Sequence, residues 1–121
     1  MFTSMGVYYY GSNWLIIKVD DSEISRYYRK LHSMYSYGVN ILKPPMHSHI
    51  TIISKYCEKP PEYFEKKYDG QAVEFSYNLQ AGVCETYVWL PVVCEHAQFL
   101  RDELGLGQPF YPFHLTIGNR K

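Results

Sequence analysis

Short apolar runs, separated by turn residues, divide this chain into predicted strands. Asn13–Val19 is rich in β-branched residues and favours a strand, and His49–Ser54 and Phe113–Asn119 have the same character. Ala72–Asn78 alternates between apolar and polar positions, as a half-buried strand does. Glu85–Val93 is predicted as a further strand because β-branched and aromatic residues dominate it.

Two longer segments have the apolar spacing of amphipathic helices. Residues 22–35 place apolar side chains three and four positions apart, directly after an Asp-Asp-Ser capping cluster. Residues 94–104 show the same spacing, and Gly105 is the predicted helix end. A shorter helix is predicted between the two prolines at 60–61 and Gly70.

Two segments of the chain repeat one another. Each consists of a predicted apolar strand, a helix, a proline-bearing loop and a last strand that contains His-x-Thr. Trp14-Leu15 in the first segment matches Trp89-Leu90 in the second. The repeat covers approximately residues 13–54 and 86–119, and the length fits a single domain over residues 1–121.

The two His-x-Thr cassettes, His49–Thr51 and His114–Thr116, place their polar side chains on one face of each strand. Residues i and i+2 of a strand point the same way, so each histidine shares its face with the threonine of its own cassette. The apolar residues between them, Ile50 and Leu115, point to the opposite face and predict a core there. Burying the polar face without partners costs about 1–3 kcal/mol per group, which favours a cleft.

Two imidazoles and two hydroxyls in one groove suit phosphodiester chemistry. One neutral histidine takes a proton from the attacking oxygen, and the other, protonated, gives one to the leaving oxygen. Histidine serves in both roles near neutral pH, and threonine hydroxyls donate hydrogen bonds to the phosphate oxygens. A zinc site from His47, His49 and His114 is the alternative, but it lacks a fourth ligand at a suitable spacing. Neither a metal nor another cofactor is therefore expected.

The segments HITIIS and HLTIGN, in their duplicated context, resemble the cassettes of the 2H phosphoesterase superfamily, also called LigT-like, over most of the chain. The resemblance implies an α+β fold: a bilobal, pseudo-twofold arrangement of two β-α-β halves, with antiparallel sheets around a central cleft. It implies a metal-independent cyclic phosphodiesterase that acts on 2′,3′-cyclic phosphates, 2′-5′ linkages or cyclic oligonucleotides. By this resemblance the catalytic residues are His49, Thr51, His114 and Thr116. The chain is similar in size to small viral members that degrade cyclic-nucleotide immune signals.

Thirteen tyrosines and two tryptophans supply rings that can stack on nucleobases. The candidate substrate-binding rings lie beside the cassettes in the sequence or on a neighbouring predicted strand. They are Tyr10, Tyr56, Tyr87, Trp89 and Tyr111. For each ring, ordinary packing in the core is the alternative interpretation. Two further histidines, His32 and His96, are expected on helix surfaces.

Composition narrows the partners and the compartment. A formal net charge of zero argues against binding to duplex DNA through broad charge attraction, and leaves a nucleotide or an RNA as partner. Three cysteines without CxxC spacing predict a reducing, cytoplasmic environment, and no apolar stretch has the length of a membrane span. A non-catalytic nucleotide- or RNA-binding protein, acting as a sponge or adaptor on the same fold, is the alternative hypothesis. Oligomeric state stays open.

Overall fold

The computed structural model describes residues 1–19, 41–42, 49–54, 66–80, 82–83, 87–109 and 111–120. Within these ranges the chain forms eight strands and one helix. In chain order they are β1 (Phe2–Tyr10), β2 (Leu15–Val19), β3 (Ile41–Leu42), β4 (His49–Ile53), β5 (Ala72–Tyr77), β6 (Gly82–Val83), β7 (Tyr87–Val93), α2 (Glu95–Glu103) and β8 (His114–Arg120).

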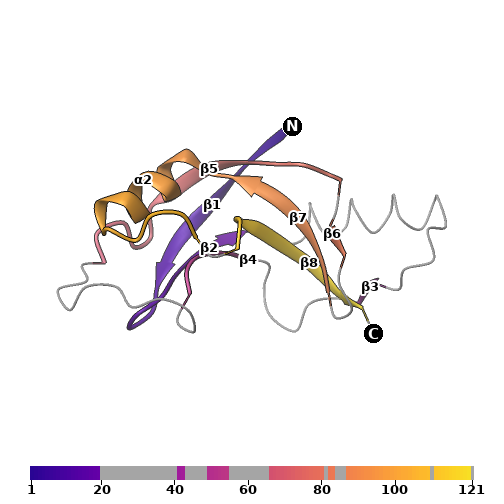
Figure 1. Ribbon diagram of the computed structural model, residues 1–121, viewed down its shortest axis with the longest axis horizontal. Coiled ribbons are helices and arrows are strands. Elements are labelled where there is room, and N and C mark those ends of the chain that lie inside the picture. Colours follow the sequence, from indigo (N-terminus) through magenta and orange to yellow (C-terminus); the bar gives the residue numbers. More distant parts are fainter. Residues whose placement is uncertain are drawn as a thin grey trace.

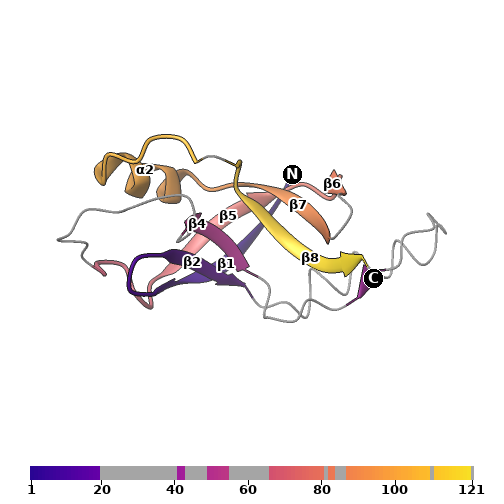
Figure 2. The ribbon, with the colours of Figure 1, turned by 60° about the horizontal axis from the view of Figure 1, so that its bottom comes forward.

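Six of these strands close into one antiparallel barrel. Their order is β8-β4-β2-β1-β5-β7, and β7 also pairs with β8, which completes the ring (Figures 1 and 2). The two-residue strands β3 and β6 pair with β8 and β7. The helix α2 lies beside one end of the barrel (Figure 1).

The closed barrel corrects the expected fold class. The α+β interpretation, with two bilobal β-α-β halves and antiparallel sheets around a central cleft, is wrong for the described residues, which form mostly sheet. The physical reason is that β4 pairs with β2 on one side and with β8 on the other. Strands that the repeat assigned to separate halves are therefore joined in one continuous sheet.

The predicted strands that fall within the described ranges are confirmed, with shifts of a few residues at their ends. The helix predicted over residues 94–104 is confirmed as α2, and Gly105 follows it with a φ of 75°. The helix predicted over residues 22–35 lies outside the described residues. Of the short helix predicted up to Gly70, the described part is a turn at residues 67–70.

The strand β1 was not predicted from the sequence, although it lies between β2 and β5 in the barrel. Its inward positions are Gly6, Tyr8 and Tyr10, and its outward positions Met5, Val7 and Tyr9 are also largely apolar. With apolar side chains on both faces, the contrast of period two that identifies a half-buried strand is absent.

The core fills the barrel with the inward side chains of every long strand. Alternation along β2 buries Leu15, Ile17 and Val19, and the same pattern holds in β5 and β7. The helix adds Ala97 and Leu100 at one end. Burial of each such side chain stabilises the fold by about 1.5–3 kcal/mol, so the core holds the strand register that positions outward residues.

Arg101 is a buried charge that connects the helix to the barrel. Its side chain is 0% exposed, and it donates from Nη1 to the carbonyl oxygen of Ile52 at 2.7 Å. It also donates from Nε to the carbonyl oxygen of Gly107 at 2.9 Å. These bonds offset the cost of burying the guanidinium and fix α2 against β4.

The described residues contain no helix that is long and apolar enough to cross a bilayer, since α2 has nine residues.

Candidate functional site

The two His-x-Thr cassettes lie on neighbouring strands. β4 and β8 pair antiparallel with Ile50 opposite Leu115. One further residue in each direction along this register sets His49 opposite Thr116, and Thr51 opposite His114. The two histidines are therefore diagonal neighbours, which lie about 7–8 Å apart in such a pair, with their Cβ atoms somewhat closer.

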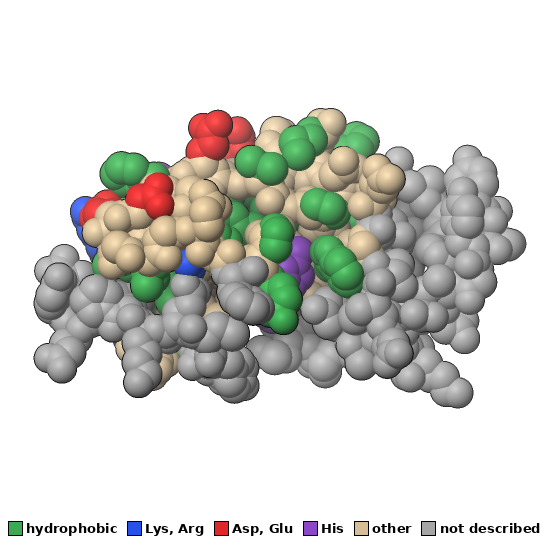
Figure 3. Space-filling view, viewed as in Figure 1, with side chains coloured by type: hydrophobic (Ala, Val, Ile, Leu, Met, Phe, Trp, Pro, Cys, Tyr) green, Lys and Arg blue, Asp and Glu red, His purple; other side chains and the backbone are tan. Residues whose placement is uncertain are grey.

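The cassette side chains point outward from the barrel. Ile50 and Leu115 are fully buried inside it, whereas the two histidines and two threonines are half-buried on the outer surface. We call this outer surface of β4 and β8, with His49, Thr51, His114 and Thr116, the cassette face. Figure 3 shows histidine side chains (purple) at the surface among hydrophobic ones (green) near the centre of the view.

Both cassette strands carry the same irregularity directly after the threonine. In β4 the pairing with β2 shifts so that Thr51 is opposite Ile16 and Ile53 is opposite Leu15. In β8 the pairing with β7 shifts so that Thr116 is opposite Trp89 and Gly118 is opposite Val88. One residue is left over in each strand, Ile52 and Ile117, which is the geometry of a β-bulge.

These registers correct one detail of the sequence repeat. Trp14 was matched with Trp89 on residue type. In the strand pairs, Ile16 holds the position equivalent to Trp89, because each lies opposite the threonine of its cassette. The two halves therefore correspond with an offset of two residues from the Trp-Leu match.

His114 has its tautomer fixed by a backbone bond. Its Nδ1 lies 2.9 Å from the carbonyl oxygen of Pro112. A carbonyl oxygen only accepts, so Nδ1 carries a proton and donates it. In the neutral ring the lone pair is then on Nε2.

Trp89 adjoins the cassette face from β7. Its indole lies 6.2 Å from the His114 ring, centroid to centroid, at an interplanar angle of 66°. The indole covers Gly82, its partner on β6, so closely that a Cβ there would overlap the ring. The ring position is thus built by the strand pairing, and one predicted substrate-binding residue lies against a cassette histidine.

The other four candidate rings differ in what the structure describes of them. Tyr10 is an inward residue of β1 and 6% exposed, so its ring belongs to the core. Tyr111 is 65% exposed in the segment before β8. The backbone of Tyr87 lies in β7 opposite Asn119, and the structure does not describe its side chain. Tyr56, like His47, lies outside the described residues.

Lys18 is a neighbour of the cassettes that the sequence analysis did not single out. It is exposed on β2 and pairs with His49 across the strands. Its Nζ lies 3.7 Å from the ring centroid of Tyr9 on β1. The alternation along Leu15–Val19 already indicates that Lys18 points outward. Only the pairing of β2 with β4 shows that it lies beside His49.

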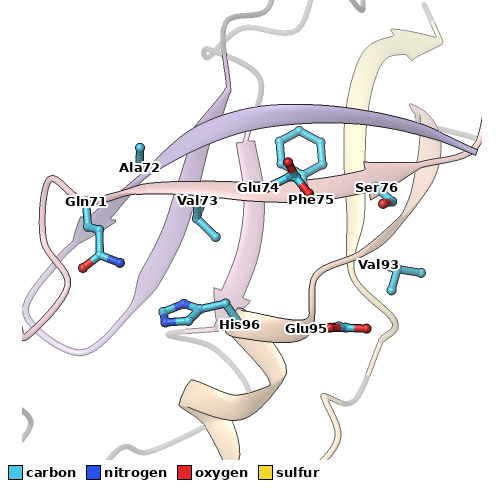
Figure 4. A pocket seen from close by; sticks show the side chains of 9 residues that line it. All are labelled: Gln71, Ala72, Val73, Glu74, Phe75, Ser76, Val93, Glu95 and His96. Carbon is cyan, nitrogen blue, oxygen red and sulfur yellow. The ribbon is translucent and has the colours of Figure 1, made fainter.

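A pocket of about 490 Å³ lies on another side of the barrel, between β5 and the start of α2. In the ring order β5 is three strands from β4 in either direction. Figure 4 shows His96 of α2 and Gln71, at the start of β5, on facing sides of it. No cassette residue lines the pocket, so the hollow and the paired histidines are separate features.

His96 in this pocket is half-buried rather than on a bare helix surface as expected. Its Nδ1 lies 2.7 Å from the hydroxyl oxygen of Tyr8, which is buried in the barrel. Burial raises the pKa of Tyr8 above its usual range, so the hydroxyl stays protonated. Tyr68 meets the His96 ring edge-on at 4.9 Å, and Phe99 packs at 6.3 Å. Burial also raises the pKa of the nearby Cys94 thiol, which disfavours its thiolate.

Metal-ligating side chains do not cluster in the described part of the chain. Within it, no three His, Cys, Asp or Glu residues are placed to hold a metal ion.

Comparison of the chain with protein-family models, with curated proteins and with solved structures gives no match. The resemblance to 2H phosphoesterases therefore stands on the two cassettes and on the positions of their residues.

Proposed function

We propose that the protein is a metal-independent phosphodiesterase for RNA-type or cyclic-nucleotide phosphodiesters, with the cassette face as its active site. One observation carries the proposal: two His-x-Thr cassettes lie antiparallel on adjacent strands, each histidine opposite the threonine of the other. Two half-buried histidines in diagonal positions on neighbouring strands can both face one phosphate group.

Hydrolysis on this face uses one histidine on each side of the phosphorus. A water oxygen attacks phosphorus while one neutral imidazole takes its proton, and the P–O bond to the ribose breaks. The leaving oxygen takes a proton from the other, protonated imidazole, so one proton is accepted and one is donated in each turnover. The threonine hydroxyls donate to the non-bridging oxygens as negative charge builds on them.

The fixed tautomer of His114 supports this assignment. With Nδ1 donating to Pro112, Nε2 is the atom that accepts a proton in the base role or delivers one in the acid role. The bond also orients the ring without using the reacting nitrogen. Trp89 beside His114 offers a ring for the base attached to the phosphate.

A substrate panel tests the proposal. The protein is incubated with 2′,3′-cyclic mononucleotides, 2′-5′ and 3′-5′ dinucleotides and cyclic oligonucleotides, with EDTA present, and products are identified by mass spectrometry. We expect turnover of at least one class, a bell-shaped pH profile and loss of turnover in His49→Ala. Asp102→Asn on the exposed face of α2 is the matched control for protein handling.

Absence of turnover in the whole panel contradicts the proposal. If calorimetry then detects binding with intact ligand recovered, the protein is the sponge or adaptor considered above. Full activity of His49→Ala also excludes the two-histidine mechanism, whatever the substrate.

A further inference from the structure

Lys18 extends the cassette face over β2 with a positive charge. We infer that the substrate carries a second phosphate beside the scissile one, and that Lys18 binds it. The substrate class is then an oligonucleotide, linear or cyclic, with at least two phosphates. This inference rests on the proposed function, because the scissile phosphate is placed at the cassettes.

The strand register places Lys18 beside the cassettes. It pairs directly with His49, and the Cβ atoms of such a pair are about 4.5–5.5 Å apart. Both side chains are on the outer surface, since β2 alternates with Leu15 and Ile17 inward. A ligand bound at His49 therefore continues over Lys18 without crossing another strand.

The ammonium group points away from His49, toward β1. Its Nζ is held 3.7 Å above the ring centroid of Tyr9, one strand further from the cassettes. Cation–π attraction and strand position together hold the charge at a distance from the scissile phosphate. A phosphate bound there is therefore a neighbouring one, which is the reason for assigning two phosphates to the substrate.

Lys18 is an exposed cation, and the two acidic residues that follow it in the sequence, Asp20 and Asp21, lie outside the described residues. The acidic side chains of the described residues lie on the turn before β5, on β5 and on α2: Asp69, Glu74, Glu95, Asp102 and Glu103. In Figure 3 the acidic side chains visible on this face (red) lie toward the α2 side of the view, and the purple surface near the centre has none beside it. Within the described residues no carboxylate is paired with Lys18, whereas Lys67 is paired with Glu103 at 2.9 Å.

Two substrates that differ by one phosphate test the inference. A dinucleoside monophosphate and a trinucleoside diphosphate of the same base, in the linkage that the enzyme cleaves, are compared by kcat/KM. In Lys18→Gln we expect the ratio of the second value to the first to fall about fivefold to tenfold. The dependence of this ratio on salt should also weaken, by about one unit of log–log slope.

Two control variants show whether the effect of Lys18→Gln comes from the loss of its positive charge. Lys18→Arg keeps the cation and its contact with the Tyr9 ring, so the ratio should stay near that of the unmodified protein. Lys67→Gln removes one positive charge from a side chain that already pairs with Glu103, and it should not change the ratio.

An unchanged ratio in Lys18→Gln overturns the inference. If both values of kcat/KM fall by the same factor, Lys18 acts at the scissile phosphate instead. If no substrate of the panel is cleaved, the proposed function fails separately, and calorimetric affinities for a dinucleoside monophosphate and a trinucleoside diphosphate replace kcat/KM. A ratio of affinities that depends on Lys18 then supports the second-phosphate site on a binding protein. A ratio of affinities that does not depend on Lys18 rules out the second-phosphate site.

Discussion

His114 on the cassette face and His96 in the α2 pocket are both half-buried histidines with Nδ1 in a hydrogen bond. Their partners differ. The carbonyl oxygen of Pro112 only accepts, so it fixes the His114 tautomer, whereas the Tyr8 hydroxyl can donate or accept and fixes none. What surrounds them differs too: a threonine lies opposite His114 and a second histidine diagonal to it, while aromatic rings enclose His96.

The hollow of the α2 pocket and the pair of histidines in register are therefore separate features of this molecule. The α2 pocket has volume, one histidine and two carboxylates at its edge, Glu74 and Glu95. It does not bring a second histidine to the first. The cassette face has two histidines and two hydroxyls in fixed register, which is the combination that acid–base chemistry requires.

The largest expected effect separates the two histidines by rate. His114→Ala should lower kcat about 10²- to 10⁴-fold, because a positioned acid or base is lost. His96→Ala, the matched control, removes the same ring from the other region and should change kcat less than about threefold. Steady-state kinetics on the cleaved substrate, with circular dichroism to check folding, measures both. Equal losses of kcat in the two variants would contradict the assignment of the reaction to the cassette face rather than to the α2 pocket.

Arg101 links the two regions, and its loss should have the next largest effect. Arg101→Leu leaves the carbonyl oxygen of Ile52 without its buried donor, while the carbonyl oxygen of Gly107 keeps its bond from Gln98 Nε2 at 3.2 Å. We expect the free energy of unfolding to fall by about 3 kcal/mol, measured by urea denaturation. Asp102→Asn, on the exposed side of the same helix, should cost less than about 1 kcal/mol.

The same bond makes Arg101 a positioning residue for the first cassette, since Ile52 directly follows Thr51. Arg101→Lys keeps the charge but cannot reproduce the fork of donors. If it folds, it should lower kcat more than it raises KM. A stable Arg101→Leu protein with unchanged kcat would contradict the link between helix and cassette.

Tyr8→Phe tests whether His96 has only a structural role. The change removes the hydroxyl that bonds His96 and keeps the ring, so the free energy of unfolding, measured by urea denaturation, should fall by about 1–2 kcal/mol. Tyr9→Phe is the control, because Tyr9 is 43% exposed and its ring contact with Lys18 is kept. Catalytic rate should not respond to Tyr8→Phe. A fall in the kcat of Tyr8→Phe would indicate that His96 and the α2 pocket take part in the reaction.

Local periodicity predicted most strands and the placement of the cassette side chains on the face opposite the core, because period two depends only on neighbours in the chain. The central cleft expected on that face is not what the structure shows, since the face is the outer surface of the barrel. It did not predict the closed barrel, which depends on long-range pairing of β4 with β8 and of β1 with β5. Tyr10 was named as a candidate substrate-binding ring because it flanks a predicted strand, but β1 was not recognised from the sequence, and in the structure Tyr10 lies in the core. Matching the repeat by Trp-Leu rather than by register misplaced the equivalence of Trp89 by two residues.

The smallest predicted effect concerns the position of the Trp89 ring, which the pairing of β6 with β7 fixes. Gly82 lies opposite Trp89 on β6, and a Cβ at Gly82 would overlap the indole. Gly82→Ala should therefore displace the ring from its edge contact with His114 and raise KM about threefold to tenfold, since stacking on a base is weakened. The His114 bond to Pro112 is untouched, so kcat should change less than about twofold.

Gly11→Ala is the matched control, because Gly11 is covered in the same way by Trp14, the other of the two tryptophans. Trp14 contacts Tyr9 and lies away from His114, so KM for a substrate with one phosphate should not rise. In a Trp14→Phe background, the fluorescence of Trp89 should shift with Gly82→Ala. A shifted emission spectrum with an unchanged KM would show that Trp89 moved without affecting substrate, and would leave the cassettes without a base-stacking ring on the β7 side.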